Sequence, residues 1–475
     1  MNGSTTGRPH VAVVGGGLAG MAAALACADG GARVTLIEGR PRLGGATFSF
    51  RRDGLWIDNG QHVFLRCCTE YRRFLRRIGS EPLTTLQRRL SIPVIGPGGP
   101  SGRLARNGLP APLHLAGSLA AFPFLRPIDR ARAVRAALAL GRLDPADPTL
   151  DRTSFGSWLE ARGQSVEAIE SLWNLIALPT LNLPPSDASL ALAVKVFRTG
   201  LLDRRDAADV GYAIAPLSEV HGERAGRAMA RSGVRIVTRS PVRRLEAAAE
   251  GPPGVVGEGG LRVEADAVIL AVPHDRASEL LPPGAIDRGI DGLGFAPIVN
   301  VHVVYDRMVM DAPFAAGVRS PVQWAFDRTI PSGLERGQYL AVSVSGAKRE
   351  IGERTEDLRA RFLPALEAMF PNAGRAVVKR FFVTREPHAT FRQAPGTASL
   401  RPGPRTRVPG LFLAGAWTDT GWPATMEGAV RSGVAAAQAA LSSLPRRPAR
   451  AASELAVTAG HSGTAAPGAL TEVGS

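Results

Sequence analysis

Cysteine, lysine and long apolar runs are scarce in this chain of 475 residues. Its three cysteines are Cys27, Cys67 and Cys68, and no Cys-x-x-Cys pair occurs. We therefore expect reduced thiols in a cytoplasmic protein, with no disulfide framework and no bound metal. Lysine stands only at positions 195, 348 and 379, so arginine supplies nearly all of the formal net charge of +15. No basic block alternates with aromatic residues, which argues against nucleic-acid binding, whereas a basic surface favours anionic lipid headgroups.

One uncharged run, residues 11–28, is long enough to resemble a signal peptide or a membrane helix. Its glycines at 15, 16, 17 and 20 weaken a spanning helix, and the apolar strand that follows completes a unit that cleavage would destroy. We therefore expect neither export nor a membrane span.

Residues 11–45 have the pattern of a dinucleotide-binding βαβ unit, in which a strand, a glycine turn, a helix and a second strand follow one another. In this pattern Gly15 permits the tight turn, Gly17 lets the backbone approach a pyrophosphate, and Gly20 lets the helix pack on the strand. The helix start offers free N–H groups to phosphates, and the carboxylate that ends the second strand accepts a ribose hydroxyl. The predicted contacts are Gly15, Gly17, Leu18, Ala19, Gly20 and Glu38.

A Gly44-Gly45 pair soon after Glu38 resembles the FAD-dependent amine oxidase and carotenoid desaturase superfamily. The resemblance implies FAD, and it adds contacts at Gly39, Arg40, Gly44, Gly45 and Ala46. Members of that superfamily usually have arginine where Ala46 stands, so one phosphate contact is missing or comes from Arg40 or Arg42. A plain NAD-binding unit with an ordinary Gly-Gly turn is the alternative.

The segment 411–440 reads as a strand, a loop and a helix that starts near Thr425. In the resembling superfamily the start of this helix, here Met426 and Glu427, faces the flavin pyrimidine edge, where it would stabilise negative charge on reduced flavin. A buried helix that packs on the sheet is compatible with this role. The resemblance also implies contacts at Gly415 and Ala416, and at the Val242 backbone near adenine. Relatives commonly have aspartate where Ala416 stands, and Asp419 is a substitute.

Four runs, at residues 57–64 (IDNGQHVF), 181–202, 384–392 and 417–433, together resemble the hydroxysqualene dehydroxylase family over most of residues 10–440. The resemblance implies reduction of hydroxysqualene to squalene on the route to hopanoids, with a hydrophobic isoprenoid substrate and an external electron donor for FAD. In such a reaction reduced flavin delivers hydride while a general acid protonates the departing hydroxyl.

Candidate general acids are Asp58, His62, Asp419 and Glu427. Each has a structural alternative: Asp58 closes a turn, His62 is an ordinary structural histidine, Asp419 binds FAD, or Glu427 caps its own helix. The sequence alone leaves these alternatives open.

These features predict an α/β fold with a Rossmann-like FAD-binding domain of the amine oxidase type and an interleaved α+β substrate domain. We expect a leader at 1–10, FAD-binding segments at 11–82, 211–290 and 405–445, substrate-binding segments at 83–210 and 291–404, and a disordered tail at 446–475. The last of these is rich in small residues and lacks periodicity.

The apolar run 112–125 fits either a hydrophobic tunnel with a membrane-dipping entrance or an ordinary core helix. The first interpretation places the protein peripherally at the inner face of the membrane. Other functions on the same fold are a carotenoid or phytoene-type desaturase, an amine oxidase, and a partner-binding protein without redox chemistry.

Overall fold

A computed structural model describes residues 8–98, 101–246 and 252–444. The predicted tail at 446–475 and most of the predicted leader lie outside these residues. His10, at the end of that leader, already begins the first strand.

A five-stranded parallel sheet forms the nucleotide side of the molecule, in the order β10-β2-β1-β14-β20. Its central strands are apolar and buried on both faces, as a parallel sheet covered by helices requires. The strands are β1 (His10–Val14), β2 (Arg33–Ile37), β10 (Arg235–Val237), β14 (Ala267–Leu270) and β20 (Leu411–Leu413). Apart from His10, which belongs to the predicted leader, the residues of these strands lie in the segments predicted for the FAD-binding domain, whose bounds stay predictions.

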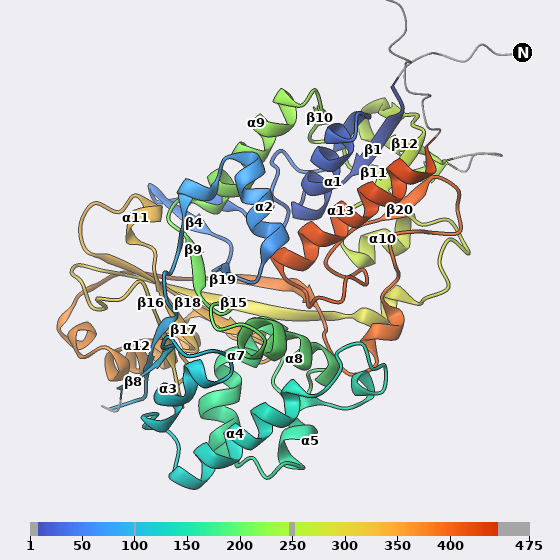
Figure 1. Ribbon diagram of the computed structural model, residues 1–475. Coiled ribbons are helices and arrows are strands. Elements are labelled where there is room, and N and C mark those ends of the chain that lie inside the picture. The colour runs from blue at the N-terminus through green and yellow to red at the C-terminus, as the bar shows by residue number, and fades with distance from the viewer. Residues whose placement is uncertain (1–7, 99–100, 247–251, 445–475) are drawn as a thin grey trace, which may run out of the picture. The chain divides into compact units, whose positions relative to one another are not determined.

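Helices α1 (Leu18–Asp29) and α13 (Met426–Ser443) pack side by side against this sheet, at the upper right of Figure 1. A Cβ at Gly433 of α13 would collide with the carbonyl oxygen of Ala19 in α1, so glycine permits this close approach. Two more helices, α2 (Thr69–Ile78) and α9 (Arg224–Arg231), share the same core. Two helices far apart in the sequence, α1 and α13, therefore pack together on one face of the nucleotide sheet.

A seven-stranded sheet crosses the middle of Figure 1, in the order β19-β15-β18-β17-β16-β7-β8. It is antiparallel except where β16 meets β7. Valines 299, 301 and 303 of β15 face α12 (Thr355–Met369), and Asn300 and His302 face the opposite side. The strands are β7 (Ser91–Ile95), β8 (Ser101–Ala105), β15 (Phe295–Tyr305), β16 (Phe314–Gly317), β17 (Trp324–Asp327), β18 (Gln338–Ser345) and β19 (Val378–Phe391).

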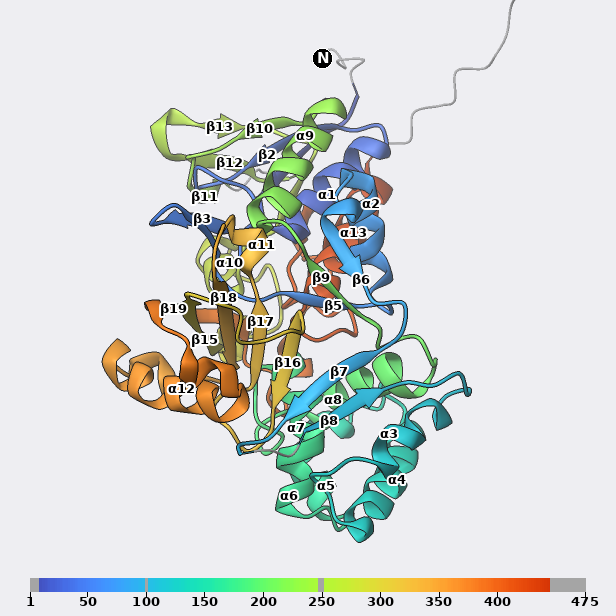
Figure 2. The same ribbon diagram turned by 90° about the vertical axis from the view of Figure 1, so that its left-hand side faces the viewer.

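Helices from the middle of the chain cover the side of this sheet opposite α12, as the turned view shows (Figure 2). They are α3 (Ala116–Ala120), α4 (Pro127–Gly141), α5 (Phe155–Glu160), α6 (Val166–Ala168), α7 (Asn174–Leu181) and α8 (Leu190–Phe197). Two more helices, α10 (His274–Leu280) and α11 (Thr329–Ser332), have seven and four residues. Phe155, Trp173 and Phe197 form an aromatic centre for this helical layer.

Three small sheets complete the fold: β11-β12-β13, β3-β4 and β5-β9-β6. The last joins strands on both sides of the predicted boundaries at 82/83 and 210/211, which stay predictions. The strands are β3 (Ser49–Arg52), β4 (Leu55–Asp58), β5 (Val63–Leu65), β6 (Thr84–Leu86), β9 (Val210–Ala213), β11 (Val242–Glu246), β12 (Gly254–Gly257) and β13 (Arg262–Val263).

The α/β fold predicted from the sequence is confirmed. The three cysteines are free thiols. No helix among the described residues is long and apolar enough to cross a membrane. The same residues contain no cluster of histidine, cysteine and acidic side chains suited to a metal ion.

Candidate flavin and substrate site

The glycine turn after β1 leaves no room for side chains. A Cβ at Gly15 would collide with the Ala271 carbonyl oxygen at the end of β14, and one at Gly20 would collide with the Gly15 carbonyl. Gly15 also has a φ of +110°, which disfavours other residues. Leu18 and Ala19 begin α1 here and are buried. The turn therefore brings bare backbone to the carboxyl end of the sheet, where α/β proteins bind nucleotides.

The Gly44-Gly45 loop lies directly on this turn. Its Gly44 N–H donates to the Gly16 carbonyl at 2.9 Å, and a Cβ at Gly45 would stand 2.8 Å from the Gly17 Cα. Ala46 is exposed and brings no charge. Arg42 lies close by, because its Nη1 donates to the Gly45 carbonyl at 3.2 Å and its guanidinium covers the Phe48 ring at 3.4 Å. Arg42 is therefore the better placed of the two arginines suggested as a substitute at this loop.

Glu38 closes the other side of the turn. Its carboxylate accepts from the Gly16 N–H at 2.6 Å and from the Arg40 N–H at 2.8 Å. Gly39 packs on Pro241, the residue before Val242. A Cβ added at Gly39 would lie 3.3 Å from the Pro241 Cα. The structure thus brings together the predicted ribose acceptor and the predicted adenine contact, which are far apart in the sequence.

The start of α13 closes the site at its C-terminal side. The Thr425 hydroxyl accepts from the Gly428 N–H at 3.1 Å and so caps the helix whose first residue is Met426. Gly415, two residues after the end of β20, has a φ of +146° and donates its N–H to the Ser432 hydroxyl at 2.8 Å. The helix N-terminus thus stands beside the carboxyl end of β20, where its dipole favours negative charge.

A buried arginine holds the loop that precedes this helix. Arg401 donates from Nη2 to the carbonyl oxygens of Thr418 at 2.6 Å, of Trp422 at 2.8 Å and of Ala416 at 3.3 Å. Asp419 is exposed and accepts only from the Gly421 N–H of its own turn, at 3.2 Å, among the described residues. The structure gives no contact between Asp419 and the glycine turn.

A polar run, Asn59-Gly60-Gln61-His62, bridges this site and the seven-stranded sheet. Asn59 Nδ2 donates to the Ala46 carbonyl at 2.9 Å, and the Asn59 carbonyl accepts from Asn300 Nδ2 of β15 at 3.1 Å. Gln61 Nε2 and Asn300 Oδ1 are buried and have no hydrogen-bond partner within the described chain. Buried polar atoms normally have partners, so these two point to a polar group that the chain itself does not supply.

The glycine cradle and these unpaired atoms fit FAD. A dinucleotide needs bare backbone at its pyrophosphate, a carboxylate at its ribose and a helix N-terminus at its flavin ring, and the described residues provide all three. The unpaired amide atoms beside the Gly44-Gly45 loop suit the polar edge of a flavin ring.

Two of the four candidate acids are held in ion pairs. The Asp58 carboxylate accepts from Arg328 at 2.5 Å, from the Ser49 hydroxyl at 2.6 Å and from the Leu217 N–H at 3.1 Å. Three donors therefore occupy the Asp58 carboxylate, which acts as a hydrogen-bond acceptor in each contact.

Glu427 is held in the same way, and the N–H groups that it caps belong to a different helix from the one that the sequence suggested. Its carboxylate accepts from the N–H groups of Glu70 at 3.2 Å and Tyr71 at 2.7 Å, at the start of α2, and from Arg431 at 2.7 Å. Glu427 therefore caps α2 rather than α13, which Thr425 caps.

His62 has more freedom. Its Nδ1 lies 3.1 Å from the Gly60 carbonyl, and its Nε2 has no partner within the described chain. Burial lowers the pKa of His62 below its usual value. Glu386 of β19 lies beside the same run, 3.4 Å from Asn59 Nδ2, and burial raises the pKa of its carboxyl. Both side chains can take up or release a proton, and neither takes part in an ion pair within the described residues.

Sequence reasoning missed Asn300, Glu386 and Arg328 as parts of this region. The signal for Asn300 was present, because an asparagine among the alternating valines of β15 is unusual for an apolar core strand. Glu386 lies in the run 384–392 that carried the family resemblance but received no role.

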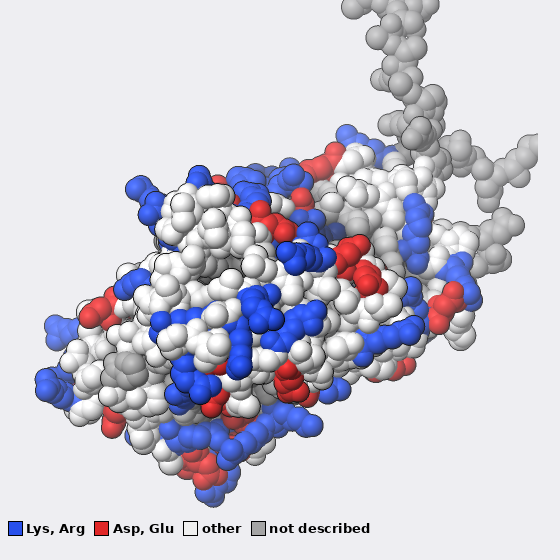
Figure 3. All heavy atoms as spheres, turned by 60° about the horizontal axis from the view of Figure 1, so that its bottom comes forward, with Lys and Arg blue, Asp and Glu red and all other residues white. Residues whose placement is uncertain are grey.

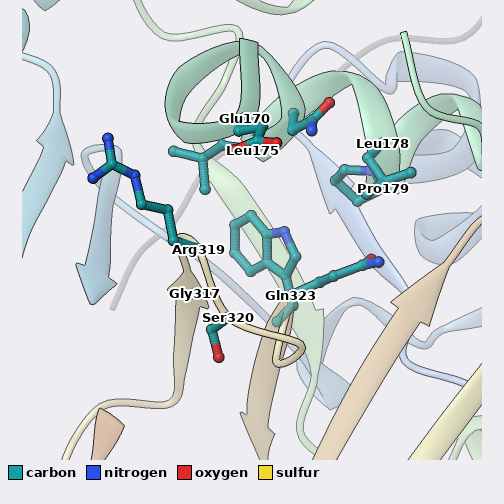
Figure 4. A pocket seen from close by; sticks show the side chains of 10 residues that line it. Glu170, Leu175, Leu178, Pro179, Gly317, Arg319, Ser320 and Gln323 are labelled. Atoms are coloured by element: carbon teal, nitrogen blue, oxygen red, sulfur yellow. The ribbon is translucent and has the colours of Figure 1, made fainter. Parts of the chain in front are cut away.

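A pocket of about 290 Å³ lies on the same side of the sheet, between α7 and the strands β16 and β17. Figure 4 shows Leu175, Leu178 and Pro179 of α7 on one side of the pocket and Gln323 on the other, while the Ser320 hydroxyl points away from the helix. Trp324 also lines it. Trp324 pairs with Ser343, and Ser343 pairs with Asn300, so all three side chains share one face.

The pocket and the polar run are therefore neighbours. Two strand spacings separate Trp324 from Asn300, which is roughly 10 Å at the usual distance between strands. The pocket has apolar walls from α7 and charged residues, Glu170 and Arg319, among its lining. None of its lining residues belongs to the glycine cradle, and five of the ten, Glu170, Asn174, Arg319, Ser320 and Gln323, are polar or charged.

Comparisons with known proteins agree with this geometry. A family model for flavin-containing amine oxidoreductases matches residues 18–441. Hydroxysqualene dehydroxylases of Sinorhizobium fredii and Rhodopseudomonas palustris are each 30% identical to the chain, over 91% of it and 98% of the relative. A zeta-carotene desaturase of Synechocystis is 26% identical, over 92% of the chain and 98% of the relative.

Solved structures share the fold at lower sequence identity. Putrescine oxidase bound to putrescine superposes with a TM-score of 0.71 and 22% identity, over 92% of this chain and 99% of that one. Cyclohexylamine oxidase from Brevibacterium oxydans gives a TM-score of 0.69 and 20% identity over the same shares.

Proposed function

This chain belongs to the flavin-containing amine oxidoreductase family as an FAD-dependent oxidoreductase, and we propose that it reduces hydroxysqualene to squalene. The observation that carries the proposal is the match to two hydroxysqualene dehydroxylases over 98% of their length. The product would serve the synthesis of hopanoids.

The protein has two tasks in this reaction besides holding the cofactor. The glycine turn at Gly15 to Gly20, the Gly44-Gly45 loop and the start of α13 would hold FAD, which in its reduced form would supply the hydride. A side chain must protonate the hydroxyl so that it leaves as water, and the pocket must orient the polyene and exclude bulk water. An external reductant restores the electrons that each turnover removes.

We assign the proton transfer to His62. It lies on the run that joins the flavin cradle to the sheet, and its Nε2 is free of partners within the described residues. Because burial lowers its pKa, the protonated ring gives up its proton more readily than an ordinary histidine does. Asp58 and Glu427 lack this freedom because ion pairs hold them.

We assign the isoprenoid chain to the pocket beside α7. Leu175, Leu178 and Trp324 provide apolar walls for one end of the polyene. The distance of roughly 10 Å to Asn300 lets another part of the same molecule reach the polar run.

The test is anaerobic incubation of the FAD-loaded protein with a chemical reductant and hydroxysqualene, followed by analysis of the extracted lipids. The proposal expects squalene in amounts that grow with time and vanish without FAD. Parallel incubations of the oxidised protein with zeta-carotene and with an aliphatic amine test the other chemistries of the fold. Flavin reduction by either compound, with no squalene from the first reaction, would contradict the proposal.

A further inference from the structure

The surface of α4 has an unusual composition. Every exposed residue of this helix is apolar or basic, and the neutral polar and acidic residues typical of a solvated helix are missing from this face. Asp129, the only acidic residue of α4, is buried at 1% exposure and paired with Arg126 at 2.8 Å. The exposed residues are Pro127, Ile128, Ala131, Arg132, Val134, Arg135 and Leu138, and the exposed Arg142 follows directly.

The segment before α4 extends this surface. Residues 107–125 contain no Asp, Glu, Lys or Arg, and α3 has no buried residue, so α3 is not a core helix. Leu109 and Leu113 are 49% and 56% exposed. Arg130 of α4 holds the segment in place through the carbonyl oxygens of Ala120 and Phe122. We call the exposed residues from 109 to 142 the α3–α4 surface.

The same surface is strongly basic. Between positions 109 and 142 the chain has five arginines, Arg126, Arg130, Arg132, Arg135 and Arg142, and one acidic residue, the buried Asp129. Within the described chain Arg135 and Arg142 take part in no ion pair, although both are exposed. Figure 3 brings the lower side of Figure 1 forward, and basic side chains outnumber acidic ones across that face. The free positive charge lies next to exposed leucine, isoleucine and valine side chains.

We propose that the α3–α4 surface docks the protein on an anionic lipid bilayer. A basic amphipathic helix lies in the plane of such a membrane, with apolar side chains among the acyl chains and arginines at the lipid phosphates. An acidic protein would satisfy the arginines but would leave the large apolar side chains without the acyl environment that suits them.

The benefit of docking rests on the proposed function, because a polyene substrate resides in the bilayer and would not have to cross water. The docking itself is argued from the α3–α4 surface alone. Vesicle binding can therefore be measured without substrate, and its result is independent of whether squalene is formed.

The test is sedimentation of the FAD-loaded full-length protein with vesicles of phosphatidylglycerol and phosphatidylcholine, and with vesicles of phosphatidylcholine alone. We expect binding to the first and little to the second. The double variant Arg132→Gln/Arg135→Gln should bind the anionic vesicles about thirty-fold more weakly, at about 1 kcal/mol for each arginine. The parent protein should keep part of its vesicle binding at high salt. The variant Leu113→Gln/Ile128→Gln should lose that part.

The matched control is Arg227→Gln/Arg231→Gln on α9, which removes the same charge from exposed positions of another helix. It should bind anionic vesicles within about twofold of the parent protein. Equal losses in the two arginine variants would show attraction by net charge alone and overturn the proposal, as would absence of binding by the parent protein. Circular dichroism and flavin content identify any variant that fails to fold.

Turnover of detergent-dispersed hydroxysqualene separates docking from catalysis. The variant Arg132→Gln/Arg135→Gln should convert the dispersed substrate at the parent rate and should be slower only with substrate in anionic vesicles. If the parent protein binds vesicles and forms no squalene, the proposed reaction fails and the docking surface stands.

Discussion

The side-chain amide of Asn59 lies 2.9 Å from the carbonyl oxygen of Ala46, and this hydrogen bond ties the polar run to the Gly44-Gly45 loop. The Asn59 carbonyl is in turn bound by Asn300 of the seven-stranded sheet at 3.1 Å. Asn59 thus links the Gly44-Gly45 loop to strand β15 of the seven-stranded sheet.

We predict that Asn59→Asp weakens FAD binding at least about tenfold, equivalent to about 1.4 kcal/mol. A carboxylate cannot donate to the Ala46 carbonyl, and it adds negative charge beside Glu386. Titration of the apoprotein with FAD, followed by flavin fluorescence, measures the effect. The control is Asn107→Asp, where the side-chain oxygen only accepts, from the Leu109 N–H at 2.9 Å. Unchanged affinity in Asn59→Asp would remove Asn59 from the account.

Gly45→Ala should give a folded protein that retains little flavin. The new methyl group would lie 2.8 Å from the Gly17 Cα, and the residue has a φ of +58°. The strain costs about 1 kcal/mol, while the collision pushes the two glycine loops apart where the pyrophosphate would bind. Visible absorbance per protein reports flavin content. Gly352→Ala, with open space around its Cβ position, is the control and should keep its flavin.

Glu427→Gln should destabilise the protein by about 3 kcal/mol, because a neutral amide replaces a buried carboxylate that binds Arg431 and caps α2. Turnover per bound flavin should change little. Urea unfolding and single-turnover kinetics measure the two quantities. A protein of normal stability with a large loss of turnover would instead return Glu427 to the list of proton donors.

His62→Gln should lower turnover at least about a hundredfold, as loss of a general acid does. The parent rate should fall as pH rises through the lowered pKa of His62, because only the protonated ring is an acid. This pH dependence should disappear in the variant. Glu386→Gln is the matched test of the neighbouring group, and a larger loss there than in His62→Gln would transfer the role to Glu386.

We predict that the buried His302 makes the free energy of unfolding depend on pH. Burial lowers its pKa to about 3, whereas an unfolded histidine takes up a proton near pH 6.5. The unfolded state therefore binds the proton first, and the free energy of unfolding should fall as pH falls below about 6.5. The decrease contributed by this ring approaches about 1.4 kcal/mol for each pH unit. Urea unfolding at several pH values gives the slope of the free energy of unfolding against pH. In His302→Gln this slope should be smaller by that amount, and a slope equal to that of the parent protein would contradict the assignment.

The parts of the fold that sequence predicts well depend on local requirements. Gly15, Gly17 and Gly20 are recognisable because the turn needs bare backbone at those spacings, whatever the rest of the chain does. The same holds for the cap at Thr425, which fixed the start of α13 within one residue.

Other parts of the site depend on contacts between distant segments, which one sequence does not reveal. Glu427 and Tyr71 are separated by 356 positions, so the α2 cap at Glu427 could not be read from spacing. Asn300 reaches Asn59 only because β15 packs beneath the polar run. The resemblance located both runs, whereas their hydrogen-bond partners required the structure.

The most direct test of the account is a single turnover without oxygen. The FAD-loaded protein is reduced with two electrons for each flavin, excess reductant is removed, and hydroxysqualene is added while flavin absorbance is recorded. The account predicts that the oxidised flavin spectrum returns as squalene forms, one molecule for each flavin. Flavin that stays reduced while hydroxysqualene remains unchanged would contradict it.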